Sequence, residues 1–256
     1  MVYFRSFFMS PSAGIIIIGD EILSGRTKDT NINWIANELN ELGIKLKEAR
    51  VIEDDKKTII NTVLEFSKKF TYVFTSGGIG PTHDDITTES IAAAFEVDLE
   101  KNKIAMNLLK KHYEKSNVEF NQARQKMAIV PKGASLIDNP VSVAPGFNIK
   151  NVYVFAGIPK IMQSMFHSIS SELKGGIIIK SKTITCDIGE GKIANDLSQI
   201  EKQFLNMKIG SYPYFNPQSF GTSIVIRSEK IEDINQALEK LTKIIKHFGG
   251  KYDIIT

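Results

Sequence analysis

Cysteine is almost absent from this chain of 256 residues, in which Cys186 is the single example. One cysteine excludes a disulfide framework and a cysteine-rich zinc site, because both need several thiols. It also fits a reducing compartment, so we expect a cytoplasmic protein. Cys186 stands in a strand-like run and is predicted to be a small buried apolar side chain.

Long apolar runs are missing as well. The opening segment 1–9 is apolar but far shorter than the roughly 20 residues of a membrane span, and no signal-peptide cleavage region follows it. We therefore predict a loose tail over residues 1–12, or translation from an upstream start codon, and no membrane partner.

A strong charge of one sign is also absent, because 32 Lys and Arg against 29 Asp and Glu leave a net charge of +3. Lysines in segments 56–69 and 101–115 stand among acidic residues, which is typical of solvated helix faces. No nucleic-acid-binding motif is present, so no nucleic-acid partner is predicted.

The glycine-rich segment 75–85 is the most informative part of the chain. It follows the apolar run 72–74 and precedes a helical pattern near Thr87, so it predicts a strand, a turn and a helix start. Glycines let the backbone approach a ligand closely, and hydroxyls with a helix N-terminus supply donors for phosphate. The predicted phosphate-binding residues are Thr75, Ser76, Gly77, Gly78, Gly80 and Thr82.

Two familiar nucleotide-binding motifs are excluded at this segment. No Lys-Ser or Lys-Thr follows the glycines, so it is not a Walker A loop, and His83 replaces the last glycine of G-x-G-x-x-G. The structural alternative is an ordinary strand-to-helix turn capped by aspartate.

Two pairs of acidic residues are predicted to meet at one edge of the sheet. Asp84 and Asp85 end the glycine segment, and Asp20 and Glu21 follow the buried apolar run 13–18. Adjacent carboxylates repel phosphate unless a divalent cation bridges the two. We therefore predict Asp20, Glu21, Asp84 and Asp85 as metal ligands, with Asp20, Asp84 and Asp85 also catalytic, and leave Mg²⁺, Mn²⁺, Co²⁺ and Ni²⁺ open as the ion.

Two further turns are candidates for ligand contact. Asp29 and Asn31 begin a helical pattern, where an aspartate can equally serve as the N-cap. Segment 139–147 contains prolines and Gly146, which predict either a stiff ligand-facing loop or a structural crossing turn. The candidate ligand contacts in these turns are Asp29, Asn31, Asn139, Ala144, Pro145 and Gly146.

Strand and helix patterns alternate from residue 15 to about 171, which predicts an α/β domain with a parallel sheet between helical layers. A break at 174–176 suggests a boundary, and the βαββα order beyond it predicts an α+β module. We therefore expect a three-layer αβα domain over 13–174 and a smaller α+β domain over 175–256.

Several motifs together resemble the molybdopterin-binding (MoaB/Mog-type) domain, and most closely the amino-terminal part of the CinA family. They cover nearly the whole chain from Ala13 onward, and their order makes the resemblance specific. They are Gly-Asp-Glu-Ile-Leu-Ser-Gly at 19–25, Asp-Thr-Asn at 29–31, the segment 75–85, and later signatures within 139–147, 157–162 and 210–213.

The CinA-type resemblance implies a metal-dependent nucleotide pyrophosphatase that hydrolyses an ADP-ribose-like or FAD-like dinucleotide. The alternatives are a non-hydrolytic protein that binds molybdopterin or its adenylylated form, and a degenerate family member. The resemblance also implies a homodimer or higher homo-oligomer, to which a helix over 232–248 offers an apolar face.

The chain departs from the family pattern at two places. Ser142-Val143 stands where the family usually has Gly-Thr, and Ile161 replaces a family glutamate, so that acid's role cannot be transferred. The carboxyl-terminal amidase domain of CinA has no counterpart before Thr256, and its activity is not expected here.

Overall fold

The computed structural model describes residues 11–216 and 219–255. These residues form two compact units that divide between Gly176 and Ile177, and each unit is considered by itself. A tail was expected over residues 1–12. Residues 1–10 lie outside the described residues, and Ser12 belongs to the first strand.

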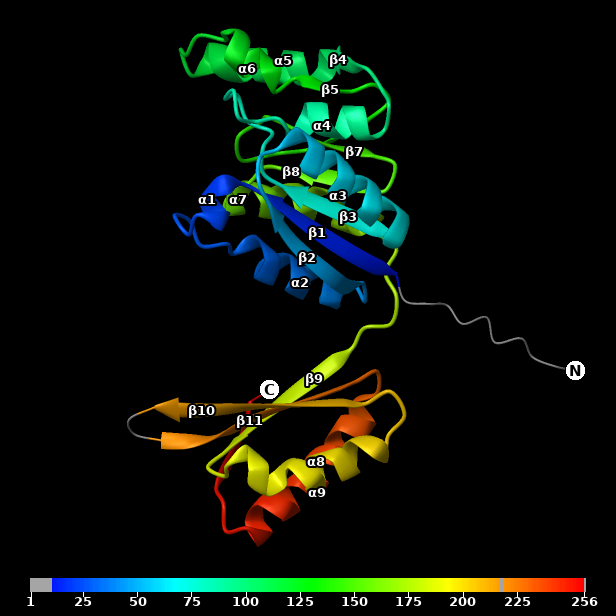
Figure 1. The fold of residues 1–256 in the computed structure, drawn as a ribbon, viewed down its shortest axis with the longest axis vertical. Coiled ribbons are helices and arrows are strands. Elements are labelled where there is room, and N and C mark those ends of the chain that lie inside the picture. Colours follow the sequence, from blue (N-terminus) through cyan, green and yellow to red (C-terminus); the bar gives the residue numbers. More distant parts are fainter. Residues whose placement is uncertain (1–10, 217–218, 256) are drawn as a thin grey trace, which may run out of the picture. The chain divides into compact units, whose positions relative to one another are not determined.

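The first unit is built on a six-stranded sheet in the order β2-β1-β3-β8-β7-β6 (Figure 1). Strands β2, β1, β3 and β8 are parallel, as predicted, but β7 runs antiparallel to both of its neighbours. The predicted three-layer αβα architecture is confirmed, and the sheet is mixed at this end because the turn between β7 and β8 is too short for a crossover. The strands are β1 (Ser12–Ile18), β2 (Lys45–Ile52), β3 (Tyr72–Ser76), β6 (Ser135–Ile137), β7 (Gly146–Ile149) and β8 (Val152–Phe155).

Helices cover both faces of this sheet and complete the three-layer arrangement. Along β1, Ala13, Ile15 and Ile17 face the core under α2 and α7, whereas Ile16 and Ile18 face the core under α3 and α4. A strand buried on both faces has no polar side, which explains its continuous apolar sequence. The helices are α1 (Asp20–Leu23), α2 (Asn31–Glu41), α3 (Lys56–Lys69), α4 (Thr87–Ala94) and α7 (Pro159–Ile169), with a short 3-10 helix at Ser170–Glu172.

Residues 95–134, between α4 and β6, form an insertion that we call the excursion. Its two short strands pair antiparallel, and its helices have a small core of Ala105, Leu109 and Ala128. This excursion contributes one wall of the cavity described below. Its elements are β4 (Leu99–Lys101), α5 (Lys103–Lys115), α6 (Gln122–Lys126) and β5 (Ile129–Pro131).

The second unit is an antiparallel sheet in the order β10-β11-β9-β12 with two helices against its apolar face. Cys186 lies buried in this core, as predicted. The last strand was not expected, because it is short and pairs with β9 far back in the sequence. The elements are β9 (Lys180–Cys186), α8 (Glu190–Lys202), β10 (Lys208–Asn216), β11 (Ser219–Ser228), α9 (Ile231–His247) and β12 (Tyr252–Ile255).

The apolar face of α9 is used inside its own unit. Ile234, Leu238, Leu241 and Ile245 are all buried in the core of the second unit. This face therefore gives no support to the expected homo-oligomer, which stays a prediction. Within the described part of the chain, no helix combines the length and apolar character required to cross a membrane.

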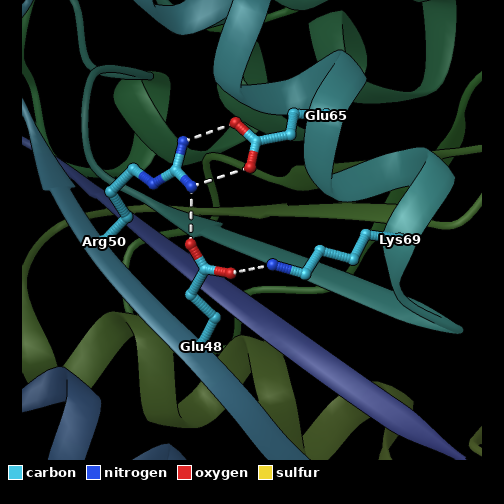
Figure 2. A network of polar contacts seen from close by, with 4 residues as sticks. All are labelled: Glu48, Arg50, Glu65 and Lys69. Atoms are coloured by element: carbon cyan, nitrogen blue, oxygen red, sulfur yellow. Dashed lines mark hydrogen bonds and ion pairs between the residues drawn. The ribbon is translucent and has the colours of Figure 1, made fainter.

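A network of charged side chains joins α3 to the edge strand β2 (Figure 2). Both terminal nitrogens of Arg50 donate to Glu65, at 2.7 and 2.9 Å, and one also donates to Glu48, which in turn accepts from Lys69 at 2.6 Å. The Arg50 guanidinium lies 4.7 Å from the ring centroid of Phe66. The hydrogen bonds from Lys69 and Arg50 lower the pKa of Glu48, and the bonds from Arg50 lower the pKa of Glu65.

We expect Arg50→Met to weaken the acid dependence of stability. Glu48 and Glu65 have folded-state pKa values below the ordinary 4.5. Their contribution to the free energy of unfolding is therefore complete above that value and is lost as the pH falls through the folded-state pKa. Urea unfolding should show the variant less stable at about pH 7, and the difference from the wild type should shrink as the pH falls below 4.5.

The matched control is Lys110→Met, which breaks the exposed pair with Glu114 on α5. It should change stability little at either pH. An equal loss at both pH values in Arg50→Met would mean that Arg50 acts only by packing on Phe66.

Candidate active site

Three parallel strands end at one point of the sheet, and glycine stands at each end. Gly19 follows β1, Gly77 follows β3, and Gly157 comes just after β8. Gly77 has φ 117°, and a Cβ there would lie 2.1 Å from the carbonyl oxygen of Ile18. A Cβ on Gly157 would lie 3.3 Å from Cα of Gly77. The strand ends are therefore closer together than side chains would allow.

Asn31, at the start of α2, ties two of these strand ends together. Its Nδ2 donates to Oγ of Ser76 at 2.9 Å and to the carbonyl oxygen of Gly157 at 2.8 Å. The Ser76 hydroxyl in turn donates to the carbonyl oxygen of Ala156 at 3.2 Å. Asn31 is 5% exposed and Ser76 1%. Both residues join elements of the fold and also line a small recess of about 60 Å³, and their predicted contact with ligand stays a prediction.

Three other predicted contacts also serve the fold. Thr75 is fully buried in β3, and the carboxylate of Asp29 accepts from the amides of Asn31 and Ile32, as an N-terminal cap does. Gly146 lies within β7, where a Cβ would approach the carbonyl oxygen of Val154 to 2.4 Å. The fold uses the Asp29 carboxylate and the Gly146 backbone, whereas the buried hydroxyl of Thr75 has no hydrogen-bond partner, and ligand contact at these three residues stays a prediction.

A cavity of about 600 Å³ opens at this edge of the sheet. Its floor includes the glycine loop after β3, in which Gly78 has φ 67°. Loop 139–145, the start of α7 and the excursion form other parts of its wall. The predicted site residues that line it are Glu21, Gly77, Gly78, Gly80, Asp84, Asp85, Asn139, Ala144 and Pro145.

Carboxylates are the charged groups of this cavity. Glu21, Asp54, Asp84 and Asp85 line it, and no Lys, Arg or His of the described residues does so. Asp20 is exposed just outside the lining. The charge at this surface is therefore negative. It repels a phosphate-bearing ligand unless a cation neutralises the repulsion.

Asp85 and Thr82 hold the acidic loop in shape. The carboxylate of Asp85 accepts from the backbone amide of Thr82 at 2.8 Å and from its hydroxyl at 2.5 Å. It also occupies the space beside Gly80, where a Cβ would lie 2.6 Å from Oδ2. Thr82 thus stabilises the loop and is not among the residues that line the cavity, and its predicted role as a phosphate donor stays a prediction.

Asp84 remains the exposed acid of the loop. Its pKa is lowered, first by hydrogen bonding with Thr82 and then by a backbone amide. The carboxylate is therefore ionised at neutral pH and open to the cavity. Asp84 is the residue of this loop best placed to meet a cation.

Asp54 is a cavity residue that the sequence analysis missed. Its Oδ2 accepts from the amide of Asp20 at 3.1 Å, and its own amide donates to Oδ1 of Asp20 at 3.4 Å. Burial raises the pKa of Asp54, and repulsion from Asp20, Glu21 and Asp84 adds to the shift. The missed signal is the acidic run 53–55 that follows the apolar end of β2, since an acid after a parallel strand had already identified Asp20.

These acids do not form a preassembled metal cage. Among residues 11–216 and 219–255, no group of three or more His, Cys, Asp or Glu side chains is gathered closely enough to hold an ion. Asp85 is bound to Thr82, and Asp20 is bound to Asp54. The four predicted metal ligands thus reach the same edge without meeting at one point.

Asn139 organises the loop that follows β6. Its Nδ2 donates to Oγ of Ser142 and to the carbonyl oxygen of Ala144, both at 2.7 Å, while Oδ1 accepts from the amides of Val141 and Ser142. This arrangement leaves Val143 at φ 66°. A β-branched residue in the left-handed region is strained, so the loop holds Val143 against its own preference.

Comparison with known proteins decides the family. The model of a probable molybdopterin binding domain matches residues 14–175. The chain belongs to this molybdopterin-binding family. A protein of Sulfurisphaera tokodaii is 33% identical over 251 residues, which cover 93% of this chain and 95% of that protein.

The resemblance to CinA-type proteins is also confirmed. The crystal structure of the protein CinA from Thermoplasma acidophilum is similar with a TM-score of 0.59 and 33% identity, and the match covers 64% of this chain and 98% of that one. The middle-domain model of FAD synthase matches residues 179–248. A probable FAD synthase of Caenorhabditis elegans is 30% identical over 279 residues, and the match covers 97% of this chain but only 54% of that protein.

We expect Val143→Asn to stabilise the first unit by about 1 kcal/mol, because asparagine tolerates the left-handed region that costs valine roughly 1–2 kcal/mol. Chemical unfolding monitored by circular dichroism measures the change. Val141→Asn, a neighbouring change at a side chain that is 45% exposed, is the control and should have little effect. Equal stability of the two variants would mean that the loop does not strain Val143.

Ile161 lines the cavity at the position of the family glutamate and is partly buried against the core. We expect Ile161→Gln to lower the free energy of unfolding by roughly 1–3 kcal/mol, the usual cost of an imperfectly paired polar group. Ile161→Glu should cost more than Ile161→Gln at about pH 8, because its charge faces the cavity acids, and the gap should close at about pH 4. A gap that does not change with pH would show that the new side chain points away from these acids.

Proposed function

We propose that the first unit is a metal-dependent nucleotide pyrophosphatase that hydrolyses the diphosphate of an ADP-ribose-like or FAD-like dinucleotide. The observation that carries this proposal is the composition of the cavity: a glycine loop in its lining, beside carboxylates and without a basic side chain in the described lining.

The charges explain why a cation belongs to the proposal. A diphosphate is anionic, and Asp84, ionised at neutral pH, would repel it. A divalent cation bound by both partners removes this repulsion. Mg²⁺ in particular is usually held by one or two carboxylates together with substrate phosphates, so a preassembled protein cage is not required.

The residues of this chain divide the work as follows. Asp84 and Glu21 would hold the ion, and the backbone of Gly78 and Gly80 would hold the phosphates through hydrogen bonds that strengthen as charge develops. When bound, the ion neutralises the diphosphate and lowers the pKa of an attacking water. Asp54 and Asp20 keep the end of β2 beside that of β1 through their mutual hydrogen bonds.

The size and walls of the cavity suit a nucleotide. Its volume of about 600 Å³ lies in the range of about 300–1,000 Å³ typical of small-molecule sites. Tyr113, Met127 and Ile158 provide apolar surface that can face a flat ring. The similarity of the chain, first unit included, to a probable FAD synthase supports a dinucleotide ligand over a simple phosphate.

A pterin-binding protein without hydrolytic activity is the second candidate. It is favoured by the description of the family as a probable molybdopterin binding domain and by the absence of a gathered metal cluster in the described part of the chain. The same glycine loop would then hold the phosphate of the pterin. The oligomeric state and the cytoplasmic location also remain proposals.

One experiment separates the two candidates. The purified protein is incubated with ADP-ribose, FAD or NAD and with Mg²⁺, Mn²⁺, Co²⁺ or Ni²⁺, and the products are separated by chromatography. Release of AMP that is abolished by a chelator supports the pyrophosphatase. Pterin fluorescence in the purified protein, with no product from any dinucleotide, supports the binding protein instead.

We expect Asp84→Asn to lower metal-dependent hydrolysis by about 10²- to 10³-fold, or roughly 2.7–4 kcal/mol of activation free energy, without loss of stability. Asparagine keeps the size of the side chain and removes the charge that the cation needs. Asp85→Asn should lower turnover and stability together, because the Asp85 carboxylate holds Thr82.

The control is Asp98→Asn, an exposed acid of the same unit that does not line the cavity. Its turnover should equal that of the wild type. Undiminished hydrolysis by Asp84→Asn at matched metal concentration would rule out the assigned role of this carboxylate.

A further inference from the structure

Lys126, the last residue of α6, forms hydrogen bonds with the main chain of the acidic loop, residues 80–85. Its Nζ donates to the carbonyl oxygen of Thr82 at 2.6 Å and to that of Asp85 at 2.8 Å. These two carbonyls bracket Asp84. One ammonium group thus fixes the main chain on both sides of the exposed acid.

The helix end that carries Lys126 is anchored on both sides. The side chain of Asn121 caps α6 by accepting from the amide of Arg124 at 3.1 Å. Two residues after Lys126, Ala128 is fully buried in the small core of the excursion, and its carbonyl accepts from the amide of Asn102 at 2.9 Å. The ammonium group is therefore delivered from an anchored helix end.

Lys126 does not reach the cavity directly. It lines a separate recess of about 110 Å³ together with Gly80, Asp85 and Thr88, whereas its neighbour Met127 lines the cavity. The end of α6 thus touches the acidic loop with one residue and the cavity with the next. Lys126 can therefore act on the site in two ways, through the main chain of the loop and through the effect of its charge on Asp84.

We propose that Lys126 is a positioning residue that holds Asp84 at the geometry required for catalysis. This inference rests on the proposed pyrophosphatase function and adds a residue to it. Hydrogen bonds from a charged donor are about twice as strong as neutral ones. They matter here because segment 80–85 belongs to no helix or strand that could fix its main chain. A site group has to be held within about 0.5 Å of its working position.

The test removes the ammonium group and then restores it. Lys126→Met should lower kcat by about 10- to 100-fold, as is typical when a partner that orients a metal ligand is lost, and should change KM little. Lys126→Cys treated with 2-bromoethylamine regains an ammonium group at nearly the same reach and should recover most of the loss. Cys186 is 2% exposed and will be spared. Iodoacetamide, which adds no charge, should not restore activity.

The matched control is Lys111→Met, an exposed lysine on α5, which should leave kcat unchanged. Wild-type kcat in Lys126→Met would overturn the proposal. A rise in KM with unchanged kcat would also overturn it, because Lys126 would then act on the charge of the substrate.

A second measurement keeps this test separate from that of the proposed function. Amide hydrogen exchange, followed by mass spectrometry, should show faster exchange in segment 82–87 of Lys126→Met and no change in Lys111→Met. Unchanged exchange in this segment would overturn the proposal that Lys126 fixes the loop, even if the protein hydrolyses no dinucleotide. Faster exchange in a protein without hydrolytic activity would uphold that role of Lys126 and reject the pyrophosphatase function.

Discussion

The close approach of three strand ends at Gly77 is the constraint on which the rest of the first unit depends. A side chain on Gly77 would collide with the carbonyl oxygen of Ile18, and Gly157 meets it from the other side. Asn31 can bind Ser76 and Gly157 only because these ends are so close. The glycine backbone that results is both the junction of the sheet and the floor of the cavity.

This junction divides the polar residues into two groups. Ser76 and Asn139 are buried and form their hydrogen bonds inside the fold, and Asn31 does so through Nδ2, whereas its Oδ1 is buried without a partner. Glu21 and Asp84 stay exposed and keep their charge for a ligand. The acids proposed to bind the cation are therefore those that the fold leaves exposed. That distinction gives the acids of the cavity their place in the proposed chemistry.

Much of the fold followed from the sequence because apolar periodicity reflects burial directly. The run 13–18 predicted a strand covered on both faces, and the structure places alternate residues of β1 in two separate cores. The direction of β7 and the pairing of β12 with β9 did not follow. Both strands are short, and the choice of partner depends on hydrogen bonds that no local pattern records.

The sequence by itself determined that glycines and acids stand at the ends of parallel strands, and hence at which edge of the sheet a site would form. Only the tertiary structure decided which of those acids are free. Asp20 is bonded to Asp54, which is 34 residues away, and Asp85 is bonded to Thr82, while Asp84 is exposed to solvent. The physical reason is that residue type fixes which hydrogen bonds a side chain can form and which ions it can bind. Which of its donors and acceptors remain available depends on neighbours that folding brings from distant parts of the chain.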